Sequence, residues 1–349
     1  MKKLAIPIIS LVAIVIVSCS GTRTVTMNAM RPAEITFPPE VNTLLIVDRT
    51  KFAKESINIL EGVLTGEMPG DDKAGVQELI NSFQQQLGRS PRFSTKIAAE
   101  RLNGNSMTSA FPSQLSWMEV QNLCNKYGTD AMVSIEMFDT DFVVTNGKRK
   151  VKKTVTEGEV KREVEVDEFY AEGVGNITIG IRLYDPVAKT IVDQQLLNKS
   201  NTWNAAGSTL KDALAALIDK SSATRYLSRN VGSDYAYKIA PMPVRISRMF
   251  YGKSKKAIQL EQGSRLADVN KWQEAADKWE SGISSAPTKE AGKLAYNTAI
   301  AYEVLGDLPK AKEWAQKAYV DFGNKDARDY VRTIQNRMYE EERIKEQMN

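Results

Sequence analysis

The chain has 349 residues, of which 42% are hydrophobic and 26% charged, a balance typical of a globular protein long enough for two domains. It contains no histidine and only two cysteines. Histidine-dependent catalytic triads and zinc sites built from imidazole or several thiolates are therefore excluded, whereas carboxylate chemistry and oxygen-ligated Ca²⁺ or Mg²⁺ remain open. The formal net charge of +4 is too small to indicate a nucleic-acid partner.

The first 19 residues have the pattern of a lipoprotein signal. Lys2 and Lys3 precede an apolar run over residues 4–17, which is shorter than the ~20 residues that a membrane-spanning helix needs. The run leads into the sequence Ile-Val-Ser-Cys ending at Cys19, which resembles the bacterial lipobox. The resemblance implies removal of residues 1–18 and acylation of Cys19, so that acyl chains attach the mature protein to the lipid bilayer. The alternative is an uncleaved anchor helix.

The residues after Cys19 bear on the side of the membrane that the protein occupies. Surface-displayed lipoproteins of Bacteroidota resemble one another in an acidic run at this place, and the sequence Ser-Gly-Thr-Arg-Thr over 20–24 has none. We therefore expect an outer-membrane lipoprotein on the periplasmic face. The polar stretch that ends in Phe37-Pro38-Pro39 predicts a tether over 19–42.

Residues 43–138 alternate between short apolar runs and amphipathic stretches. Strands are predicted over 43–47, 92–98 and 131–138, and helices over 71–87 and 117–127, each of which is followed by glycine. This order predicts an α/β sheet with helices packed on it.

From residue 138 the hydrophobic pattern has a period of two, which predicts an antiparallel meander extending the sheet. Asn146-Gly147 is a strong hairpin signal and predicts a turn. A second hairpin is expected between 176–185 and 190–200.

Two helices, over about 208–218 and 222–239, complete the first domain, which spans 43–240. Pro241 and Pro243 predict the exit from it, followed by a linker over 241–257.

Residues 258–349 are predicted to be all-helical, and the sequence repeats with a spacing of 36 residues. The pattern resembles the tetratricopeptide repeat, whose unit is a helical hairpin, and predicts an array of such hairpins closed by a capping helix. Small residues at these positions allow paired helices to approach closely. An unrelated helical bundle is the alternative. The corresponding residues are Gly263 and Ala299, Ala275 and Ala311, Trp279 and Ala315, Gly282 and Ala318, and Pro287 and Gly323.

Five aromatic residues of the predicted repeats are candidates for lining a partner-binding groove, although packing is the more common role of aromatics at helical spacing. They are Trp272, Trp279, Tyr296, Tyr302 and Trp314.

Glu136, Asp139 and Asp141 form the best carboxylate group for a metal or for acid–base chemistry. On a continuous strand Glu136 points away from the other two, so the three converge only if a bulge intervenes. A solvated strand face is therefore expected, with no metal or cofactor site. Cys124 lies on the apolar side of its helix and is expected to be a core residue.

A basic cluster over 148–153 precedes an acidic stretch over 157–168. On adjacent strands these segments would form cross-strand ion pairs on a solvated face. Contact with anionic lipid or an acidic partner is the alternative.

The domain over 43–240 is similar in pattern to the amino-terminal domain of TolB and to the curli-secretion lipoprotein. Residues 232–241, with the sequence GSDYAYKIAP, and Arg248-Met249-Phe250-Tyr251 resemble a family of Bacteroidota lipoproteins of unknown function. That family combines a lipobox, such a domain and tetratricopeptide units. The resemblance implies architecture and location, but no activity.

The sequence thus favours a non-enzymatic, lipid-anchored envelope protein whose repeats bind another envelope protein or peptide. One alternative is a structural subunit of an outer-membrane assembly or secretion complex. Another is a carboxylate-dependent hydrolase or metal-dependent enzyme in the α/β domain. No catalytic residue, cofactor or nucleic-acid partner is predicted.

Overall fold

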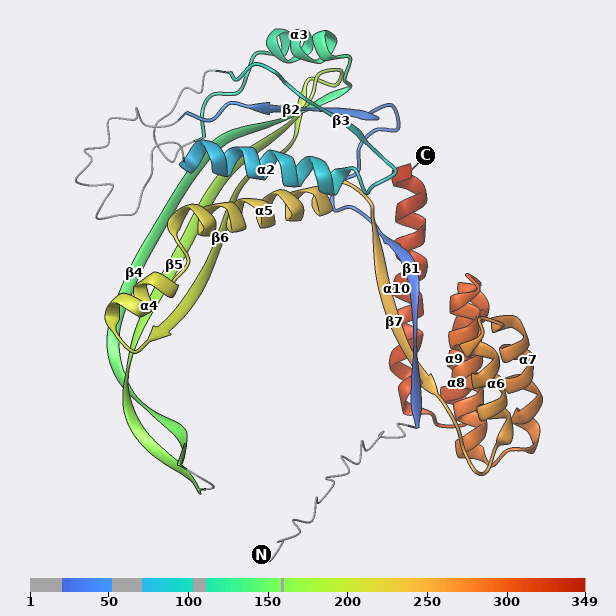
Figure 1. The fold of residues 1–349 in the computed structure, drawn as a ribbon. Helices are drawn as coiled ribbons and strands as arrows, with labels where there is room; N and C mark the ends of the chain where they lie inside the picture. Colours follow the sequence, from blue (N-terminus) through green and yellow to red (C-terminus); the bar gives the residue numbers. More distant parts are fainter. Residues whose placement is uncertain (1–20, 52–70, 103–110, 158–159, 349) are drawn as a thin grey trace, which may run out of the picture. The chain divides into compact units, whose positions relative to one another are not determined.

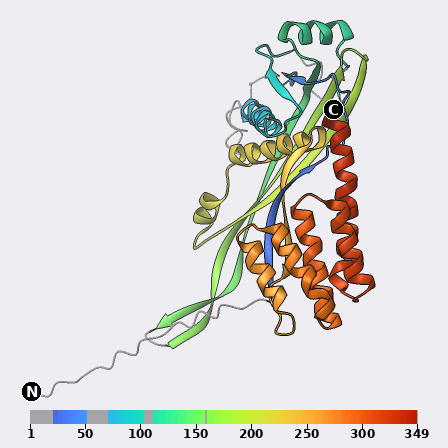
Figure 2. The ribbon, with the colours of Figure 1, turned by 90° about the vertical axis from the view of Figure 1, so that its right-hand side faces the viewer.

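The computed structural model describes residues 21–51, 71–102, 111–157 and 160–348 (Figures 1 and 2). The chain divides into two compact units. The sheet unit comprises Met30–Pro243 with Arg343–Asn349, and the helical unit comprises Met1–Ala29 with Val244–Glu342. The expected mixed sheet with packed helices, followed by an all-helical region, is confirmed.

The sheet unit is built on a five-stranded sheet of order β3-β2-β4-β5-β6. Strand β2 (Thr43–Asp48) is parallel to both β3 (Ser94–Ile97) and β4 (Ala131–Glu157). Strands β5 (Val160–Asp185) and β6 (Thr190–Gly207) continue the sheet in antiparallel order. The predicted alternation of strands and helices and the following meander are both present.

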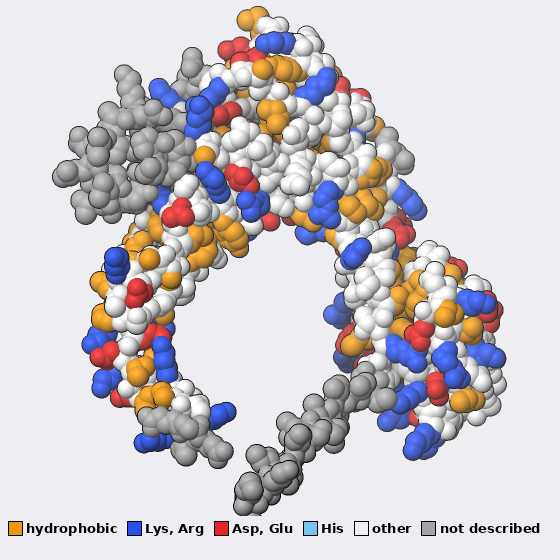
Figure 3. Space-filling model, in the orientation of Figure 1, with side chains coloured by type: hydrophobic (Ala, Val, Ile, Leu, Met, Phe, Trp, Pro, Cys, Tyr) orange, Lys and Arg blue, Asp and Glu red, His pale blue; other side chains and the backbone are white. Residues whose placement is uncertain are grey.

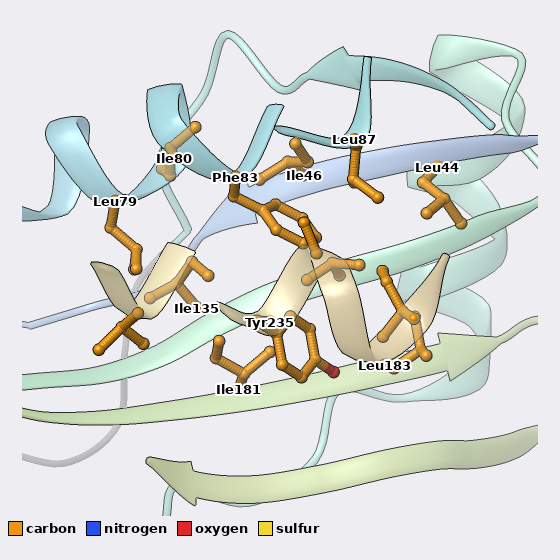
Figure 4. Packing of buried hydrophobic residues seen from close by; sticks show 14 of the residues in the cluster. Leu44, Ile46, Leu79, Ile80, Phe83, Leu87, Ile135, Ile181, Leu183 and Tyr235 are labelled. Atoms are coloured by element: carbon orange, nitrogen blue, oxygen red, sulfur yellow. The ribbon is translucent and has the colours of Figure 1, made fainter. Parts of the chain in front are cut away.

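Two helices cover one face of this sheet and a third covers part of the other. Helices α2 (Asp71–Leu87) and α5 (Lys220–Ile239) bury apolar side chains against the strands, as Figure 4 shows. Helix α3 (Trp117–Tyr127) packs on the opposite face, and the short helix α4 (Leu210–Ala216) contacts β5 and β6. The labelled core residues are Leu44, Ile46, Leu79, Ile80, Phe83, Leu87, Ile135, Ile181, Leu183 and Tyr235.

Helices α2 and α5 approach each other closely at Gly232. A Cβ atom at this position would lie 2.5 Å from the carbonyl oxygen of Leu79 and 3.0 Å from the backbone nitrogen of Phe83. Because these neighbours are backbone atoms of α2, they cannot yield as a side chain would. The glycine therefore allows the contact between the two helices.

The predicted turn at Asn146-Gly147 is wrong. Strands β4 and β5 stay paired through this point, with Asn146 opposite Ala171 and Gly147 opposite Tyr170, and continue as a long curved ribbon (Figure 1). The phenol ring of Tyr170 lies over Gly147, where a Cβ would be 2.6 Å from its hydroxyl oxygen. Gly147 therefore provides space for an aromatic side chain within a continuous strand, and it does not form a turn.

The ribbon carries the basic and acidic segments on facing strands, as predicted. Lys148 forms an ion pair with Asp167 at 2.7 Å, and Arg149 pairs with Glu168 at 2.8 Å. Lys153 also reaches Glu168, at 3.2 Å. These pairs balance the basic cluster within the chain.

The helical unit contains two consecutive helix pairs and a long final helix. The starts of α7 and α9 are separated by the spacing of the sequence repeat, and Ala275 and Ala311 are both fully buried. Among the described residues no helix is long and apolar enough to cross a membrane. The helices are α6 (Ile258–Asp268), α7 (Trp272–Gly282), α8 (Thr288–Val304), α9 (Leu308–Val320) and α10 (Lys325–Met348), with a 3₁₀ turn η1 (Ile283–Ser285) before α8.

The segments expected as a tether (19–42) and a linker (241–257) each contain a strand, which corrects both expectations. Strand β1 (Thr22–Arg31) pairs with β7 (Met242–Tyr251) in a two-stranded sheet. Its exposed and half-buried residues alternate, and Val25 packs against the core of the helical unit. Threonine-rich alternation is compatible with a strand, although its polarity led to the prediction of a tether.

Candidate functional site

The predicted aromatic surface of the helix pairs is covered by the chain's own strand β7. Phe250 is 3% exposed and lies with its ring centroid 5.8 Å from that of Trp272 and 5.9 Å from that of Trp279. The indole of Trp279 is fully buried and donates to the carbonyl oxygen of Leu260 at 3.2 Å. Trp272 and Trp279 therefore pack against a strand of the same chain.

The backbone of β7 is held at Tyr251 by side chains from two helices. The N–H group of Tyr251 donates to Oδ1 of Asn297 at 2.8 Å, and Nδ2 of Asn297 donates to the Tyr251 carbonyl at 2.7 Å. The hydroxyl of Ser264 donates to the same carbonyl at 3.1 Å. A fully buried amide thus binds an extended backbone as a neighbouring strand would.

Charged residues complete this attachment. The buried carboxylate of Glu303 accepts two hydrogen bonds from the guanidinium of Arg248 on β7, both at 2.8 Å. It also accepts from Arg337 at 2.9 Å and from the hydroxyl of Tyr330 at 2.5 Å. Bidentate pairing to a buried carboxylate fixes geometry as well as charge. Strand β7 and helices α8 and α10 therefore meet at a single carboxylate.

The five aromatic residues proposed for a groove do not form an open surface. Trp272, Trp279 and Tyr302 are buried, at 7%, 0% and 4% exposure, which corrects their assignment as partner contacts. Trp314 is half-buried and packs on the helical core. Tyr296 is also half-buried, and its ring contacts the ring of Tyr251 on the edge of a pocket described next.

We define the lysine pocket as a cavity of about 580 Å³ in the helical unit. It lies among the end of β7, the start of α8 and the loop from α9 to α10. Three of its lining residues are lysines and one is an aspartate, which gives the pocket a net positive charge. The lining residues are Tyr251, Thr288, Lys289, Lys293, Phe322, Gly323, Asn324, Lys325 and Asp326.

The wall formed by the α9–α10 loop is fixed by its local sequence. Gly323 adopts a φ of 66°, in the left-handed region that ends helices, and Asn324 then accepts a hydrogen bond from the N–H of Ala327 at 3.1 Å. Asn324 also donates to the carbonyl of Gly292 on α8 at 3.1 Å. A Cβ at Gly292 would lie 3.1 Å from Phe322, so the glycine permits this close approach.

Tyr251 links the occupied surface to the lysine pocket. Its hydroxyl donates to the carboxylate of Asp326, and burial together with this hydrogen bond raises the pKa of Tyr251 to about 12. The ammonium of Lys293 lies 5.5 Å from the centroid of the Tyr251 ring, and 3.8 Å from the carboxylate of Glu290. Burial also raises the pKa of Tyr296 behind it. Both phenols are therefore neutral at physiological pH.

The charge of the lysine pocket suits an anionic group. Lys289 at the start of α8 and Lys325 at the start of α10 both line the pocket and are exposed, and among the described residues neither forms an ion pair. Two ammonium groups that line one pocket can both donate to a carboxylate or phosphate bound in it. Sequence reasoning missed this pocket, because Lys325 becomes a neighbour of Lys289 only through the pairing of the helices.

The three carboxylates that were considered for a metal or for acid–base chemistry lie in different environments, one buried and two exposed. A β-bulge between Ile135 and Met137 is present, but Glu136 is buried and ion-paired with Arg49 at 2.7 Å. It also accepts from the hydroxyl of Tyr184 at 3.0 Å. Asp139 and Asp141 are exposed, and no group of acidic residues or cysteine in the described ranges is arranged to hold a metal ion.

The two cysteines have different outcomes. Cys124 is 2% exposed, and burial raises the pKa of its thiol, in agreement with its expected place in the core. Cys19 lies outside the described residues, so its acylation stays a prediction.

Residues 41–251 match a family model described as "Domain of unknown function (DUF8603)", and the chain belongs to this family. Residues 261–341 match a second model, "Domain of unknown function (DUF6340)". The first match ends at the last residue of β7, and the second begins within α6. A search of curated proteins finds no match.

Three solved structures show a partial likeness. The PelC dodecamer from Paraburkholderia phytofirmans is 12% identical, over 62% of this chain and 98% of that chain, with a TM-score of 0.22. TolB from Acinetobacter baumannii is 14% identical, over 50% of this chain and 26% of that chain, with a TM-score of 0.18. The hypothetical protein CT253 from Chlamydia trachomatis is 10% identical, over 57% of this chain and 98% of that chain, with a TM-score of 0.27. No residue or activity is transferred from them.

Proposed function

We propose that the protein is a lipid-anchored component of the bacterial cell envelope that acts without catalysis as a protein-interaction module. Its acyl chains at Cys19 would hold it on the periplasmic face of the outer membrane, and its helical unit would bind another envelope protein or peptide. The repeats would be of the tetratricopeptide kind. The lysine pocket is the observation that carries this proposal.

The lysine pocket favours a partner segment that bears a carboxylate. The neighbouring aromatic surface is filled by Phe250, so a partner would have to use the open part of the unit. Lys289 and Lys325 supply ammonium donors there, and Asn324 and Tyr251 supply a rigid wall because their polar groups are already engaged. An acidic side chain or chain terminus fits these donors.

Site-specific photocrosslinking in intact cells tests the interaction. A photoreactive residue at Thr288, in the pocket wall, is expected to give a protein adduct, and one at the exposed Tyr319 on α9 is expected to give none. The double variant Lys289→Glu with Lys325→Glu should lose the adduct while the helix content is retained. An adduct that persists in this variant, or that forms equally at both positions, would contradict the proposal.

Metabolic labelling tests the anchor. Labelled palmitate should enter the wild-type chain and Cys124→Ala equally, and should not enter Cys19→Ala. Because Cys124 is buried, its substitution controls for general loss of thiols without touching the proposed attachment point. Label in Cys19→Ala would refute lipid attachment at this residue.

A further inference from the structure

A short basic loop joins β7 to α6. The loop, Gly252–Ala257, contains Lys253, Lys255 and Lys256, and all three side chains are exposed. Ile258, the first residue of α6, is 53% exposed directly after it. Figure 3 shows Lys and Arg side chains at this end of the helical unit. A run of lysines followed by an exposed apolar residue is a combination that suits a membrane–water interface.

The basic loop lies beside the start of the mature chain. The N–H of Gly252 donates to the carbonyl of Gly21 at 2.8 Å, which fixes the loop next to a residue only two positions after Cys19. Two residues span at most ~7 Å when fully extended. Acyl chains on Cys19 would therefore bring the basic loop to the lipid headgroups.

Two carboxylates of the neighbouring helices have partners other than Lys255 and Lys256. Asp268 on α6 is ion-paired with Arg23, and Glu290 on α8 faces the hydroxyl of Ser254 and the ammonium of Lys293. Among the described residues, neither Lys255 nor Lys256 forms an ion pair. These two ammonium groups therefore keep their charge available to an external anion.

We infer that the basic loop rests on anionic phospholipid headgroups of the leaflet that holds the acyl chains. This inference rests on the proposed lipid attachment at Cys19. Each lysine near an anionic membrane surface raises the affinity about fivefold, and the effect is screened by salt. None of the three lysines lines the lysine pocket, so the loop is a second and separate surface.

A fluorescent probe at the loop tests the inference. The acylated protein is extracted in detergent and reconstituted into vesicles of phosphatidylcholine, with or without phosphatidylglycerol. An environment-sensitive fluorophore on Ile258→Cys can be attached selectively, because Cys19 would be acylated and Cys124 is 2% exposed. Its emission should rise in the vesicles that contain phosphatidylglycerol and fall again at high salt. The same probe on Val269→Cys, at the other end of α6 and 65% exposed, should not respond.

Charge variants identify the cause. Lys255→Gln with Lys256→Gln should lower the ratio of surface-bound to free loop by about 25-fold, as two lysines at a factor of five each require. Lys271→Gln with Lys312→Gln removes the same charge from residues near the starts of α7 and α9, and should have no effect. If the protein stays attached but the emission is equal in both kinds of vesicle, the contact of the loop with anionic headgroups is refuted and the proposed lipid anchor is not. Loss of the protein from the vesicles overturns both the contact and the proposed lipid anchor.

Discussion

Asn297 binds both backbone polar groups of Tyr251 with one side chain, at 2.8 and 2.7 Å. The last residue of β7 thereby gains a neighbour on the side away from β1, although no strand is present there among the described residues. This contact holds an extended segment against the helix pairs, where the ring of Phe250 contacts those of Trp272 and Trp279.

Truncation of this amide should destabilise the helical unit. In Asn297→Ala the N–H of Tyr251 loses its acceptor in a buried place, so the free energy of unfolding is expected to fall by about 2 kcal/mol. Urea unfolding followed by tryptophan fluorescence measures the loss. Asn336→Ala, an exposed asparagine on α10, is the matched control and should change little. Equal stability of the two variants would show that the contact is not structurally important.

Removal of the charge of Glu303 should have a larger effect. Glu303→Gln leaves Arg248 and Arg337 without their shared carboxylate in a buried environment, which costs about 3 to 5 kcal/mol. Glu313→Gln, on the exposed surface of α9, controls for loss of one carboxylate. Thermal unfolding of the two variants provides the comparison, and a drop in Tm confined to Glu303→Gln is the expected outcome.

A methyl group at Gly232 should separate two helices of the sheet unit. Gly232→Ala places its Cβ against the backbone of α2, and overpacking against atoms that cannot rotate away costs about 1 to 3 kcal/mol. Ser233→Ala, the adjacent half-buried residue, is the control. Amide hydrogen exchange in α2 and α5 should accelerate in the first variant only. Unchanged exchange in Gly232→Ala would mean that the helices can shift without cost.

The phenol of Tyr251 should make stability depend on pH in alkaline solution. Its pKa is raised from an ordinary value near 10 to about 12 by burial and by the hydrogen bond to Asp326, so the folded state favours the neutral form. The contribution to stability is complete below pH ~10 and is lost as the pH rises toward the folded-state pKa. Tyr251→Phe has no such proton, so the stability difference between wild type and variant should narrow over this range. Urea unfolding of both proteins across this pH range measures the difference. A difference in the free energy of unfolding that widens as the pH rises would contradict the prediction.

Local patterns were sufficient to predict much of the sheet unit. The capping box from Ser116 to Glu119, with Gly128 in the left-handed region, gives α3 its predicted limits. The short apolar run predicted over 43–47 forms most of the buried strand β2, because continuous burial on both faces needs such a run. A helix or strand could be predicted where a single segment contains both its hydrophobic pattern and the residues that mark its ends.

Long-range pairing explains the errors. Thr26 of β1 meets Ser247 of β7 across 221 residues. The polarity of β1 and the two prolines near the start of β7 each hid a strand whose partner is so distant in sequence. At Asn146-Gly147 a local turn preference is overridden by continuous cross-strand pairing and by the ring of Tyr170.

The candidate site likewise depends on contacts between segments that are distant in the sequence. The prediction of a partner-binding groove was wrong for Trp272 and Trp279, because Phe250, which contacts both, comes from the segment expected as a linker. Lys289 and Lys325 come from different helices, and only the fold of the α9–α10 loop places both in the wall of one pocket.

The pairing of β1 with β7 has a consequence for the order in which the protein can fold. Strand β1 is made first, yet its partner follows only after nearly the whole sheet unit. Until then β1 presents an unpaired edge that another chain could adopt as a template. A synthesis product that stops before Met242 would keep this edge exposed permanently. Chains truncated before Met242 are therefore expected to associate with other chains more readily than the complete protein does.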